Sequence, residues 1–175
     1  MSIDDVLAQW DWRSAHGTRV AASPERAAAA LREFSGRDLP VTGALMRLRT
    51  LGRRTFDDRP TVQAMTRIGL TVLVDERHAV VLGGALSPWR LRGGHRAIAS
   101  ADELRAFAEP GWVRVATTFT VAPDGGGCRV GTETRIAATD ETARRRFGRY
   151  WRLIGPFSSV TRREMLAAIR RRAEA

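Results

Sequence analysis

Three histidines and one cysteine are the side chains best suited to metal binding or nucleophilic catalysis. His16, His78 and His95 stand far apart and share no metal-ligand spacing. His78 falls in a predicted hairpin turn, where we expect solvent exposure, and His95 falls in a glycine-rich segment that could reach a cavity mouth. Cys128 begins a predicted strand and is expected to be a small buried or half-buried side chain of the core, not a nucleophile. The sequence therefore predicts no metal site and no cofactor, and it identifies no catalytic residue.

Glu133 and Arg135 are the charged residues closest to a chemical role, because they share one face of a predicted strand. If that face lines a cavity, Glu133 could act as a general base and Arg135 could anchor a substrate oxygen. If it faces solvent, the two would form a weak cross-strand ion pair with a residue such as Arg114. Val130 and Ile136 occupy the opposite face, which favours the solvent interpretation.

Length and composition predict one domain over residues 1–175, because a chain of 175 residues can bury a sizeable core. A single cysteine excludes an internal disulfide. No apolar run approaches the roughly 20 residues that cross a bilayer, so no membrane insertion is expected. The opening MSIDDVLAQW is acidic and unlike a signal peptide. These features predict a cytoplasmic location, as a monomer or homodimer.

The formal charge of +10 raises the question of nucleic acid as a partner. All 29 basic residues are arginine, and no lysine or asparagine occurs, which is typical of codon choice in a GC-rich genome. The arginines are also dispersed along the chain. We therefore do not expect nucleic acid to be the partner, although an arginine-rich helix face stays open as an alternative surface.

The segment 139–175 predicts one long amphipathic helix that needs a large apolar partner. Its arginines fall on the outer side, at Arg145, Arg149, Arg152, Arg163 and Arg170. Its apolar arc contains Phe147, Tyr150, Trp151, Ile154, Phe157, Thr161, Met165, Ala168 and Ile169. Gly155-Pro156 predicts a kink or break near Ile154, because proline removes a backbone hydrogen bond. The kink would either fit the helix to a curved sheet or open a mouth to a cavity.

The remaining elements place helices before a run of antiparallel strands. A first strand over about residues 10–22 leads into Ser23-Pro24, which is typical of a helix start. A second helix follows residue 40, with Val41, Leu45 and Leu48 on one face, and TVQAMTRIG predicts a short helical piece. Next come a hairpin of LTVLVDE and AVVLGGAL and a hairpin of WVRVATTFTV and CRVGTETRIA. The layout between residues 87 and 110 stays open. This order predicts an α+β fold.

Three stretches carry a resemblance to a known superfamily: RVAASPERAAAAL, FAEPGWVRVATTFTVAPDGGGCRVGTETRI and FGRYWRLIGPFSSVTRREMLAAIRRRAEA. They resemble the START-like (SRPBCC) superfamily, which includes the Bet v 1-like and polyketide cyclase-like proteins, and look like a bacterial branch of it. The resemblance implies a helix-grip fold, in which a curved antiparallel sheet wraps around the C-terminal helix. It also implies a cavity between them for an apolar or amphipathic small molecule, without implying a reaction.

Nine residues are predicted to line that cavity if it exists: Met46, Met65, Trp89, Phe119, Thr134, Phe147, Tyr150, Trp151 and Ile154. The competing interpretation is that they fill a dry core. The favoured function is binding or sequestration of a small hydrophobic or amphipathic molecule, which is the one partner we expect. A cyclase- or hydratase-like enzyme acting in the same cavity is the first alternative. An interaction or nucleic-acid-binding protein that uses the arginine-rich helix face is the second.

Overall fold

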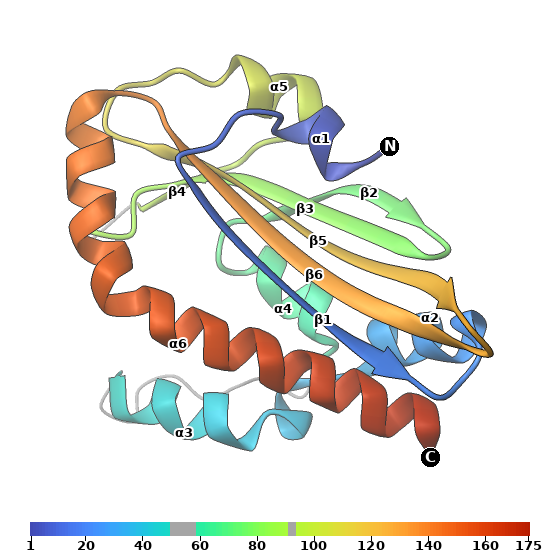
Figure 1. The fold of residues 1–175 in the computed structure, drawn as a ribbon. Coiled ribbons are helices and arrows are strands. Elements are labelled where there is room, and N and C mark those ends of the chain that lie inside the picture. The colour runs from blue at the N-terminus through green and yellow to red at the C-terminus, as the bar shows by residue number, and fades with distance from the viewer. Residues whose placement is uncertain (50–58, 91–93) are drawn as a thin grey trace.

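The computed structural model describes residues 1–49, 59–90 and 94–175 and contains a curved antiparallel sheet (Figure 1). Neighbouring strands follow the order β1-β6-β5-β3-β2, with β4 paired to β3. The strands are β1 (Trp12–Val20), β2 (Thr71–Glu76), β3 (Ala79–Leu86), β4 (His95–Arg96), β5 (Val113–Asp124) and β6 (Gly127–Ala138). Every pair is antiparallel. Both predicted hairpins are therefore confirmed.

The helices lie on both sides of this sheet. They are α1 (Ile3–Val6), α2 (Pro24–Glu33), α3 (Pro40–Arg49), α4 (Thr61–Thr66), α5 (Ala101–Ala106) and α6 (Glu141–Glu174), with a 3₁₀ turn η1 (Gly36–Asp38). Figure 1 shows α6 running along one face of the sheet, with α2, α3 and α4 on the same side. The short helices α1 and α5 lie on the other side. We call these the inner and the outer face.

Local sequence explains where the main elements begin and turn. The Ser23 hydroxyl accepts a hydrogen bond from the Arg26 backbone N–H and so caps α2, as Ser23-Pro24 predicted. Asp140 caps α6 in the same way through the N–H of Ala143. The β5–β6 turn requires glycine, because Gly125 and Gly126 have φ angles of 51° and 84°. These features set where α2 and α6 begin and where β5 turns into β6.

Each face of the sheet has its own apolar core. On the inner face, Phe119, Val130 and Ile136 pack with α2 and with Ile169 of α6. On the outer face, Ile3 and Val6 of α1 and Leu104 of α5 pack with small strand residues. The sequence predicted the inner core, but it did not predict that α1 covers the outer face.

Helix α6 is continuous from residue 141 to 174 and contains Pro156 (Figure 1). The figure shows it bent between a shorter first part and a longer second part, so the predicted kink is confirmed. Leu166 and Ala173 of the second part are buried, although the predicted arc did not include them. Phe157 was placed in that arc wrongly, since it is 46% exposed. The reason is that a bend at proline changes the direction of the buried face, which a single straight helix cannot describe.

The predicted α+β, helix-grip architecture is confirmed by these elements, because a curved antiparallel sheet holds a long C-terminal helix against its inner face. One detail of the prediction for the second helix, now α3, is wrong. Val41 is 51% exposed instead of packed with its helix face. Glu164 of α6 explains this orientation, because its carboxylate caps α3 and accepts hydrogen bonds from the backbone N–H groups of Val41 and Thr42 at 2.7 Å.

Candidate functional site

A band of polar side chains crosses the inner face of the sheet, between apolar residues on either side. The strand register places His16 beside Thr132, and Thr132 beside Phe119. The neighbouring row is Ser14, Thr134 and Thr117. The hydroxyls of Thr117 and Thr134 are 3.0 Å apart and buried. We call Ser14, His16, Thr117, Thr132 and Thr134 the inner polar band.

Arg162 of α6 reaches into this band from the opposite side. Its guanidinium donates hydrogen bonds to the hydroxyl of Thr132 at 3.1 Å and to that of Thr117 at 3.3 Å. It also lies 5.8 Å from the centre of the Phe119 ring. Within the described part of the chain, no carboxylate forms an ion pair with Arg162, and most of its N–H groups have no acceptor. The band therefore contains a cation, Arg162, for which no described residue supplies a counter-charge.

Burial sets the protonation of the two titratable groups here. Arg162 is half-buried as a whole residue, with its guanidinium at the enclosed end, and loss of solvent there lowers its pKa to about 10, so that it remains charged at neutral pH. The pKa of His16 is lowered first by burial and then by the positive charges of Arg163 and Arg162. The Ser14 hydroxyl and the His16 Nε2 are 3.2 Å apart. The site thus combines a fixed positive charge, a neutral imidazole and several hydroxyls.

An aromatic group adjoins the polar band where the first part of α6 meets β1. The Phe147 ring contacts Trp12 at 4.8 Å, Tyr150 at 5.8 Å and Trp151 at 5.6 Å, measured between ring centres. Trp89 is the fourth neighbour, at 6.3 Å. The indole Nε1 of Trp89 is buried without a hydrogen-bond partner. The structure therefore brings together four of the predicted lining residues and adds Trp12.

The other predicted lining residues lie at separate places around the same core. Phe119 is fully buried against Phe34, and Thr134 belongs to the inner polar band. Met65 of α4 is buried in the same core, and Ile154 is half-buried at the bend of α6. Met46 belongs to α3, but its side chain lies outside the described residues.

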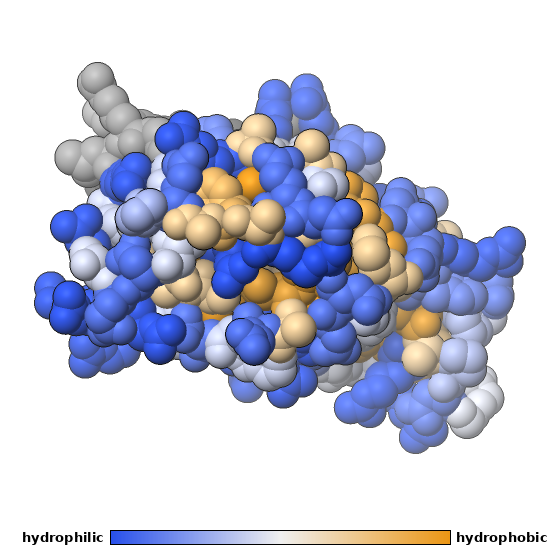
Figure 2. All heavy atoms as spheres, turned by 90° about the horizontal axis from the view of Figure 1, so that it is seen from above, coloured by the Kyte–Doolittle hydropathy of each residue, from blue (hydrophilic) through white to orange (hydrophobic). Residues whose placement is uncertain are grey.

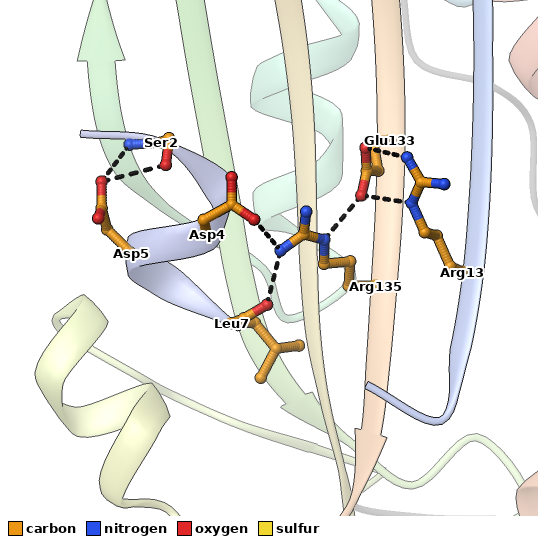
Figure 3. A network of polar contacts seen from close by, with 7 residues as sticks. All are labelled: Ser2, Asp4, Asp5, Leu7, Arg13, Glu133 and Arg135. Carbon is orange, nitrogen blue, oxygen red and sulfur yellow. Dashed lines mark hydrogen bonds and ion pairs between the residues drawn. The ribbon is translucent and has the colours of Figure 1, made fainter. Parts of the chain in front are cut away.

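Glu133 and Arg135 lie on the outer face, away from α6, in a network with the N-terminal segment (Figure 3). The Arg135 guanidinium contacts Glu133 at 2.7 Å and Asp4 at 2.7 Å, and it donates to the Leu7 carbonyl at 3.0 Å. Arg13 binds Glu133 through two N–H groups, at 2.8 and 3.0 Å. The predicted solvent exposure is wrong for Arg135, which is only 5% exposed because the N-terminal segment covers it.

The predicted partner of this pair is also different from the observed one. Arg114 donates instead to the backbone carbonyl of Arg105, and Arg13 takes the place beside Glu133. The hydrogen bond from Arg13, followed by that from Arg135, helps to lower the pKa of Glu133 against the effect of burial. Neither Glu133 nor Arg135 faces the inner core, so the general-base role predicted for a cavity-facing Glu133 does not apply on the inner face.

A hollow of about 450 Å³ opens on the outer face, lined by residues that include Ala15, Thr120, Gly131 and Glu133. Figure 2 looks at the molecule from this side and shows hydrophilic residues surrounding a central apolar area. Met1 lines the hollow and is 52% exposed. The hollow lies on the opposite side of the sheet from the cavity that the resemblance implies.

The histidines and the cysteine do not meet in one place. His95 is exposed on β4, and His78 lies in the β2–β3 turn, 3.9 Å from a Glu25 oxygen. Cys128 is fully buried, as predicted, and burial raises the pKa of its thiol. Among the described residues, no group of three His, Cys, Asp or Glu side chains is placed to hold a metal ion. None of the described helices has the length and apolar character that a membrane span requires.

The outer side of α6 carries the arginines that the sequence placed there. Arg145, Arg149, Arg152, Arg163 and Arg170 are all exposed. Leu153, Phe157 and Val160 are exposed apolar residues of the same helix. Sequence reasoning missed Arg162, which was not singled out among so many arginines. The alternating threonines of β5 and β6 were the available signal, because hydroxyls on a core-facing strand face need a polar partner.

Comparisons with known proteins give structural similarity only. No protein-family model matches the chain, and no curated protein matches it. The crystal structure of TTHA0849 from Thermus thermophilus is 14% identical, with a TM-score of 0.38 and coverage of 93% of this chain and 97% of that one. Truncated norcoclaurine synthase from Thalictrum flavum is 13% identical, with a TM-score of 0.32 and coverage of 91% of each chain.

A third structure, Ara h 8.0201, is 8% identical, with a TM-score of 0.30 and coverage of 93% of this chain and 97% of that one. The sheet order and the position of α6 themselves show that this chain is an α+β protein with a helix-grip architecture.

Proposed function

We propose that this protein binds a small amphipathic molecule between the inner face of the sheet and α6. The observation that carries the proposal is the inner polar band, because a core that only stabilises a fold rarely contains several hydroxyls, an imidazole and a guanidinium together. The aromatic group around Phe147 supplies an apolar surface next to that band. Binding sites for small molecules combine apolar walls with a few polar groups in this way.

The bend of α6 supports a route into this space. Ile154 and Gly155 are half-buried where the helix changes direction at Pro156. Trp151 lies directly beside Gly155, since a Cβ at that glycine would be 3.5 Å from the indole ring. Movement of Trp151 and Ile154 would admit a ligand to the aromatic group without breaking a strand pair. In this proposal the chain works as one START-like unit, in the cytoplasm, as a monomer or homodimer.

Native mass spectrometry of the protein purified from its own host tests this function. We expect a species heavier than the bare chain, whose extra mass is released on denaturation and identifies the ligand. Titration with N-phenyl-naphthylamine, an apolar dye, provides a second readout through a saturable rise in dye fluorescence. A mass equal to that of the chain alone, together with no saturable dye binding, would contradict the proposal.

A second candidate function, an enzyme of the cyclase or hydratase kind, is favoured by the contact between Ser14 and His16. The lowered pKa of His16 leaves its imidazole neutral at pH 7, so that it can accept a proton from a bound substrate. Arg162 would stabilise negative charge that develops on an oxygen nearby. The test is incubation of host small-molecule extracts with the wild-type protein and with His16→Gln. Gain or loss of water in one compound, present only with the wild type, supports catalysis, and identical extracts exclude it.

A further inference from the structure

We propose that Arg162, together with the hydroxyls of Thr117 and Thr132, binds the anionic group of an amphipathic ligand. This inference rests on the proposed function, because it assigns the chemical class of the molecule that enters between the sheet and α6. The anion is a carboxylate or an acid of similar size and charge, attached to an apolar or aromatic body. The acid group lies at Arg162, and the body lies toward the aromatic group around Phe147.

The first argument compares Arg135 and Arg162, two described arginines whose guanidinium groups lose solvent in the fold. Arg135 on the outer face is surrounded by its own counter-charges, Asp4 and Glu133, each at 2.7 Å. Arg162 on the inner face contacts two neutral hydroxyls and the ring of Phe119, but no carboxylate within the described part of the chain. A guanidinium that loses water without gaining an anion destabilises the folded state. The folded chain provides counter-charges for Arg135, but its described residues provide none for Arg162. An anion supplied by a ligand would give Arg162 the counter-charge that Asp4 and Glu133 provide for Arg135.

The second argument concerns the hydrogen-bonding capacity around Arg162. The guanidinium has a planar arrangement of donors that suits two oxygens of one acid group. Two of its nitrogens each bind one threonine hydroxyl, and the remaining N–H groups have no acceptor among the described residues. The hydroxyls of Thr117 and Thr132 can turn their own protons toward an added oxygen. The site therefore offers donors from both α6 and the sheet.

The third argument is that the described strand residues next to Arg162 carry no negative charge. Glu164, two residues further along α6, binds the backbone N–H groups at the start of α3 instead. The strand residues that Arg162 contacts are Thr117, Thr132 and Phe119, and its charge also acts on His16. None of these four side chains carries a negative charge. Glu133, the one acidic residue of β6, points to the outer face, where it binds Arg13 and Arg135. An incoming anion thus meets positive potential from Arg162 and no carboxylate on the strands that it contacts.

In this proposal the apolar body of the ligand binds next to the aromatic group around Phe147. The Nε1 of Trp89 is buried without a partner, and it can donate to a second polar atom of the ligand. Phe147 is the ring neighbour of Trp89, and Trp12 and Trp151 pack on Phe147 in turn. A ligand with an acid at one end, and with a hydrogen-bond acceptor on its apolar body, therefore satisfies both the cation and the unpaired indole.

Two dyes of the same ring system test the inference. Anilinonaphthalene sulfonate carries an acid group, and N-phenyl-naphthylamine is the same skeleton without it. Fluorescence titrations use the full chain as wild type, as Arg162→Met, and as the control Arg163→Met. Arg163 is the matched control because it is the adjacent residue of α6 but is exposed. Melting curves of all three proteins establish that each is folded.

We expect Arg162→Met to weaken binding of the sulfonate dye about tenfold or more and to change binding of the neutral dye by less than about twofold. Arg163→Met should leave both affinities near those of the wild type. Equal loss of sulfonate binding in the two variants would show general surface attraction and overturn the inference. Loss of binding of both dyes in Arg162→Met would show that Arg162 maintains the structure of the core. That result would also overturn the inference.

The two dyes distinguish failure of the anion site from failure of the proposed function. Saturable binding of the neutral dye, with sulfonate affinity unchanged by Arg162→Met, would overturn the anion site and leave the proposed function standing. If neither dye binds the wild-type protein saturably, both the proposed function and the anion site are overturned. Protection of Trp fluorescence from an aqueous quencher by the sulfonate dye, in the wild type but not in Arg162→Met, would support the inner location.

Discussion

Arg135 and Glu133, two residues apart on β6, form an ion pair of 2.7 Å beneath the N-terminal segment, where the side chain of Arg135 is almost fully covered. The same guanidinium lies 4.2 Å from the centre of the Trp10 ring and binds the carbonyl of Leu7. This pair therefore attaches residues 1–11 to the outer face of the sheet (Figure 3). It is a structural feature on the opposite side from the proposed ligand site.

Replacement of Arg135 should destabilise the protein strongly. Arg135→Ala leaves Glu133 partly buried with one partner fewer and frees the N-terminal segment, so we expect the free energy of unfolding to fall by about 3 kcal/mol. Arg129→Ala is the control, because Arg129 is an exposed residue of the same strand and face, and it should change stability by less than about 0.5 kcal/mol. Urea denaturation followed by Trp fluorescence measures both. Equal effects would contradict the importance of the network.

Acid should weaken the same network through Glu133. Its pKa is lowered in the folded state, so the unfolded chain binds a proton more readily and protonation favours unfolding. The stability that Glu133 contributes is present above its ordinary pKa of 4.5 and is lost as the pH falls through the lowered folded-state value. Glu133→Gln should therefore have a smaller loss of stability between neutral and acid pH than the wild type. Parallel pH profiles of the two proteins would show that other carboxylates dominate.

Removal of the positive charge at Arg162 should stabilise the ligand-free protein. Methionine fills similar volume and avoids the desolvation of an unpaired cation, so Arg162→Met is expected to raise the free energy of unfolding by about 1 to 3 kcal/mol. Arg163→Met, on the exposed side, should have little effect. Thermal and urea unfolding of protein freed of ligand by denaturation and refolding measure the difference. A marked loss of stability in Arg162→Met would mean that its hydrogen bonds to Thr117 and Thr132 outweigh its burial.

His16 should titrate below the ordinary histidine pKa of 6.5. Because burial, Arg163 and Arg162 all disfavour its charged form, the unfolded chain protonates first, and stability falls as the pH drops below 6.5 toward the folded-state value. Arg162→Met should raise the pKa of His16, since one of the nearby positive charges is gone. NMR titration of the imidazole signals, assigned with His16→Gln, measures the change. An unaltered His16 pKa in Arg162→Met would place the two groups too far apart to form one site.

Much of the sheet could be predicted from the sequence, because the alternation of apolar and polar residues in a strand is a local pattern. The alternation in 113–121 and 128–136 correctly placed Phe119 and Thr134 on the core-facing side, since side chains on a strand point to opposite faces in turn. The aromatic residues Phe147, Tyr150 and Trp151 were likewise correctly placed toward the sheet. Four-residue α1 was missed, because so short a helix has almost no periodic signal and forms only on the surface that it covers.

The sequence by itself determined the order of the main elements outside residues 87–110, the two hairpins, the starts of α2 and α6, and the core-facing side of β5 and β6. Only the tertiary structure decided which arginines lie inside. Pro156 redirects the second part of α6 so that Arg162 meets Thr117 and Thr132, and the N-terminal segment folds back to bury Arg135. Both depend on contacts between residues far apart in the chain. The periodicity of a single segment carries no information about such contacts, because it records only which side of that segment is apolar.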